Sequence, residues 1–86
     1  MPEISRFFGI SITMNFDDHN PPHFHVQYGD QQGIVRIAPC TLMDGRLSPR
    51  VLGLVMEWAA LHQAELEANW NRARSRRPLE RIAPLE

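Results

Sequence analysis

The sequence contains no lysine, one cysteine and no long apolar run, and these absences exclude several classes of protein. The single cysteine, Cys40, rules out an intrachain disulfide and a zinc site built on paired cysteines, which makes a reducing cytoplasm the expected compartment. No stretch reaches the roughly 18 apolar residues of a membrane span. The N-terminus also lacks the basic and then apolar pattern of a secretory signal. We therefore predict a soluble, unprocessed, cytoplasmic protein with no membrane partner.

The charge balance is close to neutral. Nine arginines supply all the positive charge against ten acidic residues, for a formal net charge of −1. A nucleic-acid partner would therefore need a local basic patch. Arginines do crowd the C-terminal end, and their simplest interpretation is a solvated helix end that interacts favourably with the helix dipole. The alternative is a nucleic-acid surface, with Arg72 and Arg76 as candidate anion contacts.

The length of 86 residues fits a single domain, residues 1–86, whose core is marginal unless its elements are long or subunits associate. A hydrophobic content of 43% is too high for an intrinsically disordered chain, so this domain is expected to fold.

Alternating apolar and polar residues predict three strands. Residues 7–14 alternate and are rich in β-branched and aromatic side chains, which is typical of one half-buried strand. Residues 23–28 alternate again, and Gly29-Asp30 predicts a tight hairpin connection to a third strand at 33–38. The intervening prolines and polar residues predict a turn, and residues 39–48 are expected to form a connecting loop.

One helix is predicted from Ser48-Pro49 to about Arg74, with serine as N-cap and proline in the first helical position. At helical spacing its apolar residues fall on one broad face that must cover the sheet. Pro78 ends the helix, and the tail beyond it is expected to pack back or onto a neighbour. The predicted fold class is α+β: a small antiparallel three-stranded sheet packed against one long C-terminal helix, with a short C-terminal tail.

The segment DDHNPPHFH, residues 17–25, holds three of the four histidines. His23 and His25 are two apart on a predicted strand, so their side chains project from the same face. They could bind a divalent metal ion together with His19 or a loop aspartate, or act as an acid/base pair with Asp18. The structural alternative is two surface histidines on a solvated strand face, with Asp18 and Asn20 forming hydrogen bonds within the turn.

His62 is expected to play a separate role. It lies near the centre of the apolar helix face beside Trp58, and Glu65 is close enough on the helix to bind it. We interpret it as a core or interface histidine. If the helix covers the sheet face that carries Phe24, His23 and His25 point away from the helix and cannot meet His62 within one chain.

Four segments carry a resemblance to a known family: PEISRFFGI, DDHNPPHFHV, EWAALH and the closing PL-x-x-I-x-PL. Together they resemble, over nearly the entire chain, the small bacterial family called domain of unknown function 4160. The resemblance marks signature positions without assigning them roles: His19, Asn20, Pro21, Pro22, His23, Phe24, His25, Glu57, Trp58 and His62. It also implies a place in small two-gene modules, which suggests a toxin–antitoxin-like role.

Two functions are therefore expected. The first is an interaction component of such a two-gene module, which binds a small partner protein or associates with itself through an open sheet edge or the helix. The second is a small histidine-dependent hydrolase or nuclease, with or without a divalent metal ion. In it His23 and His25 supply acid/base or ligand groups, Asp18 orients them, and Arg36 on the neighbouring strand contacts an anion.

Overall fold

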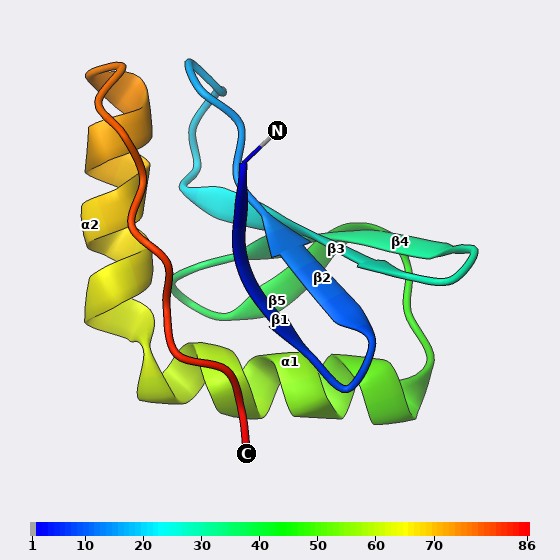
Figure 1. The fold of residues 1–86 in the computed structure, drawn as a ribbon. Coiled ribbons are helices and arrows are strands. Elements are labelled where there is room, and N and C mark those ends of the chain that lie inside the picture. Colours follow the sequence, from blue (N-terminus) through cyan, green and yellow to red (C-terminus); the bar gives the residue numbers. More distant parts are fainter. Residues whose placement is uncertain (1) are drawn as a thin grey trace.

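The computed structural model describes residues 2–86, which form a five-stranded antiparallel sheet and two helices (Figure 1). The strands are β1 (Glu3–Phe7), β2 (Ile10–Thr13), β3 (His23–Tyr28), β4 (Gln31–Arg36) and β5 (Thr41–Arg46), paired in chain order. The helices are α1 (Pro49–Leu61) and α2 (Gln63–Arg74). The α+β class is confirmed, and the predicted β3–β4 hairpin is present, but a three-stranded sheet with one long helix is wrong.

The first correction concerns residues 7–14, which form parts of two strands and not one. Phe7 pairs with Ile10, so the chain reverses through the two-residue turn Phe8-Gly9. Both turn residues have positive φ, 51° and 79°, as tight hairpin turns that match the sheet twist require. Phe8 continues the apolar alternation of the sequence although the residue is 53% exposed, so the alternation alone does not reveal the turn.

The second correction concerns residues 39–48, which contain strand β5 and not only a loop. β5 is an edge strand that pairs with β4, and five of its six residues are exposed. An exposed edge strand does not require alternating apolar and polar residues. The sequence pattern therefore did not predict β5. Gly45 has φ 85°, and a Cβ there would lie 2.3 Å from the Gln32 carbonyl oxygen, so only glycine fits this position.

The third correction concerns the helix, which breaks at His62. His62 has φ −124° and ψ 26°, and its N–H bonds to the carbonyls of Trp58 and Ala59 as α1 ends. The predicted start is confirmed, because Ser48 Oγ accepts a hydrogen bond from Val51 N. No glycine or proline marks the break. As Figure 1 shows, α1 and α2 then run in different directions and lie along different parts of the sheet.

The core lies between one face of the sheet and the two helices. Trp58 is fully buried at its centre, with its ring centroid 5.3 Å from that of Phe7 and 5.8 Å from that of Phe24. The predicted helix face is largely confirmed, since its buried members are Val51, Val55, Trp58, Ala59, Leu66, Trp70 and Ala73. Within residues 2–86, neither helix has the length and apolar character needed to cross a bilayer.

The C-terminal tail packs back on its own chain, as predicted. In Figure 1 it runs beside α2 and then past α1. Ile82 N donates to the Ile4 carbonyl at 2.7 Å, on the β1 side of the sheet, and Trp58 Nε1 donates to the Ala83 carbonyl at 2.8 Å. The tail therefore completes the domain beside β1, which leaves β5 as the uncovered edge.

Candidate metal centre

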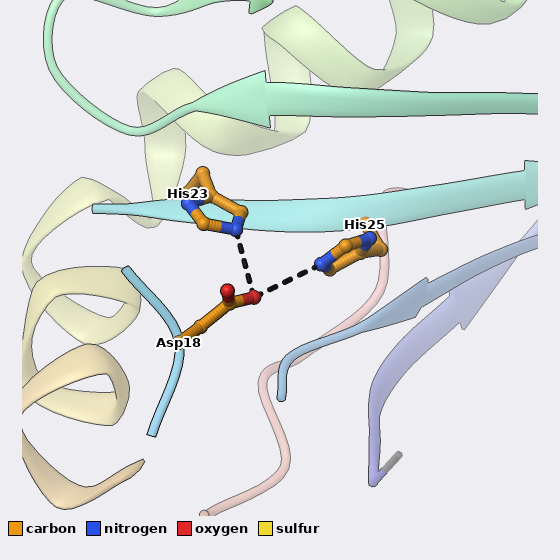
Figure 2. A group of neighbouring side chains, drawn as sticks. All are labelled: Asp18, His23 and His25. Carbon is orange, nitrogen blue, oxygen red and sulfur yellow. Dashed lines mark hydrogen bonds and ion pairs between the residues drawn. The ribbon is translucent and has the colours of Figure 1, made fainter. Parts of the chain in front are cut away.

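Three side chains converge where the loop after β2 meets the start of β3 (Figure 2). His23 and His25 are the first and third residues of β3, and Asp18 reaches them from the loop. Asp18 Oδ2 lies 2.9 Å from His23 Nε2 and 3.3 Å from His25 Nε2. One atom from each of the three residues lies within 4.8 Å of the other two. All three residues belong to the segment singled out in the sequence, and Asp18 rather than His19 completes the group.

The loop that carries Asp18 is tied to the end of α2. Asp17 N donates to the Ala73 carbonyl at 3.4 Å, and the Asp17 carboxylate forms an ion pair with Arg76. Asp18 Oδ1 in turn accepts a hydrogen bond from its neighbour's backbone, His19 N, at 2.9 Å. These contacts fix the carboxylate in position, while the exposed His19 ring lies outside the converging group.

The two histidines face different surroundings. The His23 side chain is only 8% exposed, and its ring lies 5.2 Å from the Trp70 indole of α2. His25 and Asp18 are more open, with 26% and 22% of their side chains exposed. The prediction that both histidines point away from the helix is wrong for His23, because the break at His62 brings α2 against the start of β3. The group is therefore closed on its α2 side and open on the other.

The hydrogen bonds of His23 define its protonation. Nδ1 lies 2.8 Å from the Pro21 carbonyl oxygen, which can only accept, so Nδ1 carries a proton. Nε2 faces the Asp18 carboxylate at 2.9 Å. If His23 is neutral, Nε2 has only a lone pair, and two lone pairs would repel each other at this distance. The contact therefore requires either a second proton on His23 or a cation between the two groups.

Asp18 is well suited to either arrangement. Partial burial raises its pKa, but hydrogen bonds from His19 N, His25 and His23 outweigh burial and hold the pKa below its usual value. The carboxyl group is therefore ionised at neutral pH. An ionised carboxylate beside two imidazoles is a typical ligand set for zinc and related divalent transition metals.

The open side of the group leads into a depression on the sheet face opposite the helices. One part, about 470 Å³, is lined by Asp18, His23 and His25 with Asn15, Ile34 and Asp44 among others. A second part, about 280 Å³, extends over β3, β4 and β5 and shares His25, Ile34 and Asp44 with the first. We call the two together the open-face groove. Among the described residues 2–86, no arginine lines either part.

The chain also matches a known family across this region. The family model described as domain of unknown function (DUF4160) matches residues 9–71, about three quarters of the chain. The protein belongs to the DUF4160 family. Neither a curated protein sequence nor a solved structure gives a significant match. The converging residues all lie inside the matched segment, and the family description names no activity, so the site itself carries the functional argument.

Several DUF4160 signature positions shape the loop before β3 and do not belong to the converging group. The Pro21 carbonyl accepts the His23 Nδ1 proton, and the Pro22 carbonyl accepts a hydrogen bond from Ile37 N at 3.0 Å. The two prolines therefore position the start of β3, through carbonyls that face His23 and β4. Asn20 is exposed in the same loop and lines the groove beside them.

The remaining DUF4160 signature positions lie in the core or on helix α1. Phe24 is fully buried against Trp58, whereas Glu57 is exposed on α1. The His62 ring lies 5.7 Å from that of Trp58, and its Nδ1 contacts Glu65 Oε1, as predicted. His62 is not one of the residues that converge on Asp18.

The arginines proposed as anion contacts are all engaged within the chain. Arg36 pairs in register with His23 across β3 and β4. The contacts of the three side chains are Arg36 Nε to the Ala38 carbonyl, Arg72 to Asn69 and Glu80, and Arg76 to Asp17. None of the three lines the open-face groove in the part of the chain that the structure describes.

Sequence reasoning missed Asn15. Its Nδ2 lies 3.2 Å from His25 Nε2 and 3.5 Å from Asp18 Oδ2, at the edge of the converging group. The signal that could have found it is strand register, because Thr13 pairs with His25 and Asn15 follows two residues later. That register is not visible in a single sequence without knowing which strands pair.

Proposed function

We propose that this protein binds one divalent transition-metal ion through Asp18, His23 and His25 and uses it to hydrolyse a substrate held in the open-face groove. The observation that supports this most is the arrangement of His23. Its Nδ1–H is committed to the Pro21 carbonyl, and its Nε2 is directed at a carboxylate oxygen that His25 also faces. A ligating histidine that donates its other ring N–H to a carbonyl is the usual arrangement at metal centres.

The competing explanation is an ion pair between a doubly protonated His23 and Asp18. That arrangement would place the imidazolium charge on a side chain that is only 8% exposed and lies against Trp70. Burying a charge is unfavourable unless it is well paired, and here His25 faces the same carboxylate oxygen. A metal ion would instead be held by both Nε2 atoms and the carboxylate at once, and this favours the metal-binding proposal.

The chemistry follows from the groups present. A zinc-class ion acts as a Lewis acid and lowers the pKa of a coordinated water toward about 7, which provides a hydrolytic nucleophile. Asp18, His23 and His25 would hold the ion, and the Pro21 carbonyl would orient the His23 ring. Substrate would enter from the open side of the group, because Trp70 covers the other side.

Charge in the groove favours a neutral or cationic substrate over a phosphodiester. Asp18 and Asp44 both line it, and among residues 2–86 no arginine does. The charges of a bound divalent ion, Asp18 and Asp44 would sum to zero, so the groove offers no net positive charge to attract a phosphodiester. We therefore propose hydrolysis of a neutral ester or amide, with cleavage of RNA as the contrasting outcome.

Metal titration tests the binding step. Protein stripped with a chelator and titrated calorimetrically with Zn²⁺ is expected to take up one ion per chain. His25→Ala and Asp18→Asn should each weaken binding by more than about tenfold. His62→Gln serves as the matched control, since it removes a histidine outside the group and should leave affinity unchanged. A wild-type protein that takes up no zinc, or equal affinity in all four proteins, contradicts the proposal.

Hydrolysis is tested separately with the zinc-loaded protein. A neutral chromogenic ester should be hydrolysed faster by the wild type than by His25→Ala, with RNA cleaved at the same rate by both. RNA cleavage that depends on His25 would replace the neutral substrate with a nucleic acid. If both proteins hydrolyse the ester at the same rate, the hydrolytic part of the proposal is rejected and only metal binding remains.

The second candidate function is the interaction role in a two-gene module. It is supported by β5, an edge strand with five of six residues exposed, including Met43, whose side chain is 43% exposed. An uncovered strand edge can bind another strand through its free backbone groups.

Co-purification with the product of the neighbouring gene tests this role. Met43→Asp should weaken association, whereas Met56→Asp, on exposed α1 surface, should not; equal association in both variants removes β5 as the interface.

A further inference from the structure

We infer that Asn15 is an additional ligand of the metal, through its side-chain oxygen after the amide group has turned over. This inference depends on the proposed function, since it requires an ion at Asp18, His23 and His25. It assigns a role to a residue outside the family signature and outside the group of three.

The Asn15 amide already lies within the cluster. Its Nδ2 atom is 3.2 Å from His25 Nε2 and 3.5 Å from Asp18 Oδ2, and these are its side chain's hydrogen-bond partners. Its Oδ1 atom is buried and has no hydrogen-bond partner among residues 2–86. The side chain is thus held by the cluster through its nitrogen alone, with its acceptor unused.

A bound cation reverses which atom of the Asn15 amide is favoured to face the cluster, from the nitrogen to the oxygen. The ion takes up the lone pair of Asp18 Oδ2, so Asn15 Nδ2–H loses the acceptor that the metal-free protein offers it. The N–H group would then point its positive end at a positive ion. Oxygen and nitrogen of an amide are nearly equal in size, so a half turn exchanges their places without moving the backbone. The oxygen then faces the ion, as amide oxygens do at metal sites.

Four of the six distances between these ligand atoms fit one small ion, and the His23 and His25 ligand atoms lie within 4.8 Å of each other. The contacts among these atoms are 2.9 Å for Asp18 to His23, 3.3 Å for Asp18 to His25, 3.2 Å for Asn15 to His25 and 3.5 Å for Asn15 to Asp18. In a tetrahedral site with bonds of about 2.0–2.1 Å, ligand atoms lie roughly 3.3 Å apart. Two imidazole nitrogens and two oxygens thus suit zinc or cobalt(II) better than the larger, oxygen-bound calcium ion. The water that the proposed hydrolysis needs would then join the ion as a fifth ligand from the open side.

The test compares zinc affinity, by competition with a coloured chelator, in the wild type and two Asn15 variants. Asn15→Ala removes the oxygen and should weaken affinity at least tenfold. Asn15→Asp places a charged oxygen at the same position and should tighten it. Asn71→Ala, in an exposed residue of α2 that does not line the groove, is the control and should match the wild type. Circular dichroism verifies that each variant is folded, and Asn15→Asp still tests the proposal if Asn15→Ala is not.

Cobalt(II) spectra give a second readout that a purely structural role would not change. Cobalt bound to the wild type should show visible bands set by two nitrogen and two oxygen ligands from the protein, and Asn15→Ala should show shifted bands as solvent replaces the amide oxygen. If zinc affinity and the cobalt spectrum are the same in Asn15→Ala as in the wild type, while Asp18→Asn still abolishes binding, the inference is overturned and the metal centre stands. If the wild type binds no metal, both are overturned.

Discussion

The imidazole of His23 lies against the indole of Trp70, with 5.2 Å between ring centroids. This contact joins the first residue of β3 to the last helix and closes one side of the candidate metal centre. It exists because the helix breaks at His62 and α2 leaves the line of α1 (Figure 1). The helix break, which looks like an irregularity of the fold, therefore shapes the site.

The same contact supplies an optical probe of metal binding. Co²⁺ or Cu²⁺ bound to His23 should quench Trp70 fluorescence, because both ions quench a nearby indole. Trp58, the other tryptophan, lies against Phe7, Phe24 and His62. The Trp70→Phe variant keeps an aromatic ring beside His23 and should lose most of the quenching. Equal fractional quenching in both proteins would show that the ion binds elsewhere.

Acid should weaken the metal-free protein through Asp18. Because the folded-state pKa of Asp18 is lowered, its contribution to stability is complete above the unfolded pKa of about 3.9 and is lost as pH falls through the folded pKa. With chelator present, urea unfolding of the wild type should therefore lose more stability between about pH 5 and pH 3 than that of Asp18→Asn. If the free energy of unfolding changes with pH in the same way in both proteins, the ionised Asp18 carboxylate is not stabilised by its neighbours in the folded state.

Predictions from sequence succeeded where a local pattern has a single physical cause. Ser48-Pro49 satisfies helix N–H groups and presets φ, so the start of α1 was predictable. The density of histidines and aspartates in residues 17–25 likewise pointed to the segment in which three side chains converge, although it did not show which aspartate or histidine would do so.

The sequence predictions that were wrong share a different cause: at those positions tertiary contacts determine the local structure. Phe8 looks like a core residue but occupies a turn, and His62 lies in a favourable helical pattern but ends a helix. Asn15 joins the site only through the pairing of β2 with β3. Strand pairing and helix direction depend on residues distant in the chain, so no local pattern reveals them.

Two glycines offer a matched test of the fold around β5. Gly45→Ala should destabilise the protein by at least about 2 kcal/mol, since φ is 85° there and the new Cβ would meet the Gln32 carbonyl. Gly53→Ala, within α1, meets no atom within 4 Å and should stabilise the protein by about 0.5–1 kcal/mol. Urea denaturation measures both. A tolerated Gly45→Ala would show that β5 is not held against β4 as described.

The C-terminal tail should depend on Asn69, a fully buried residue of α2. Its side chain acts in both directions, because Nδ2 donates to the Glu80 carbonyl at 2.8 Å and Oδ1 accepts from Glu80 N at 3.0 Å. Asn69→Ala leaves both backbone groups without these partners and should lower the free energy of unfolding by about 2–3 kcal/mol. Asn71→Ala, two residues away and exposed, should change it by less than about 0.5 kcal/mol.

Limited proteolysis provides the structural readout: cleavage after residue 78 should accelerate in Asn69→Ala and not in Asn71→Ala. Equal cleavage rates would show that the hydrophobic contacts of Ile82 and Leu85 hold the tail without this pair of hydrogen bonds.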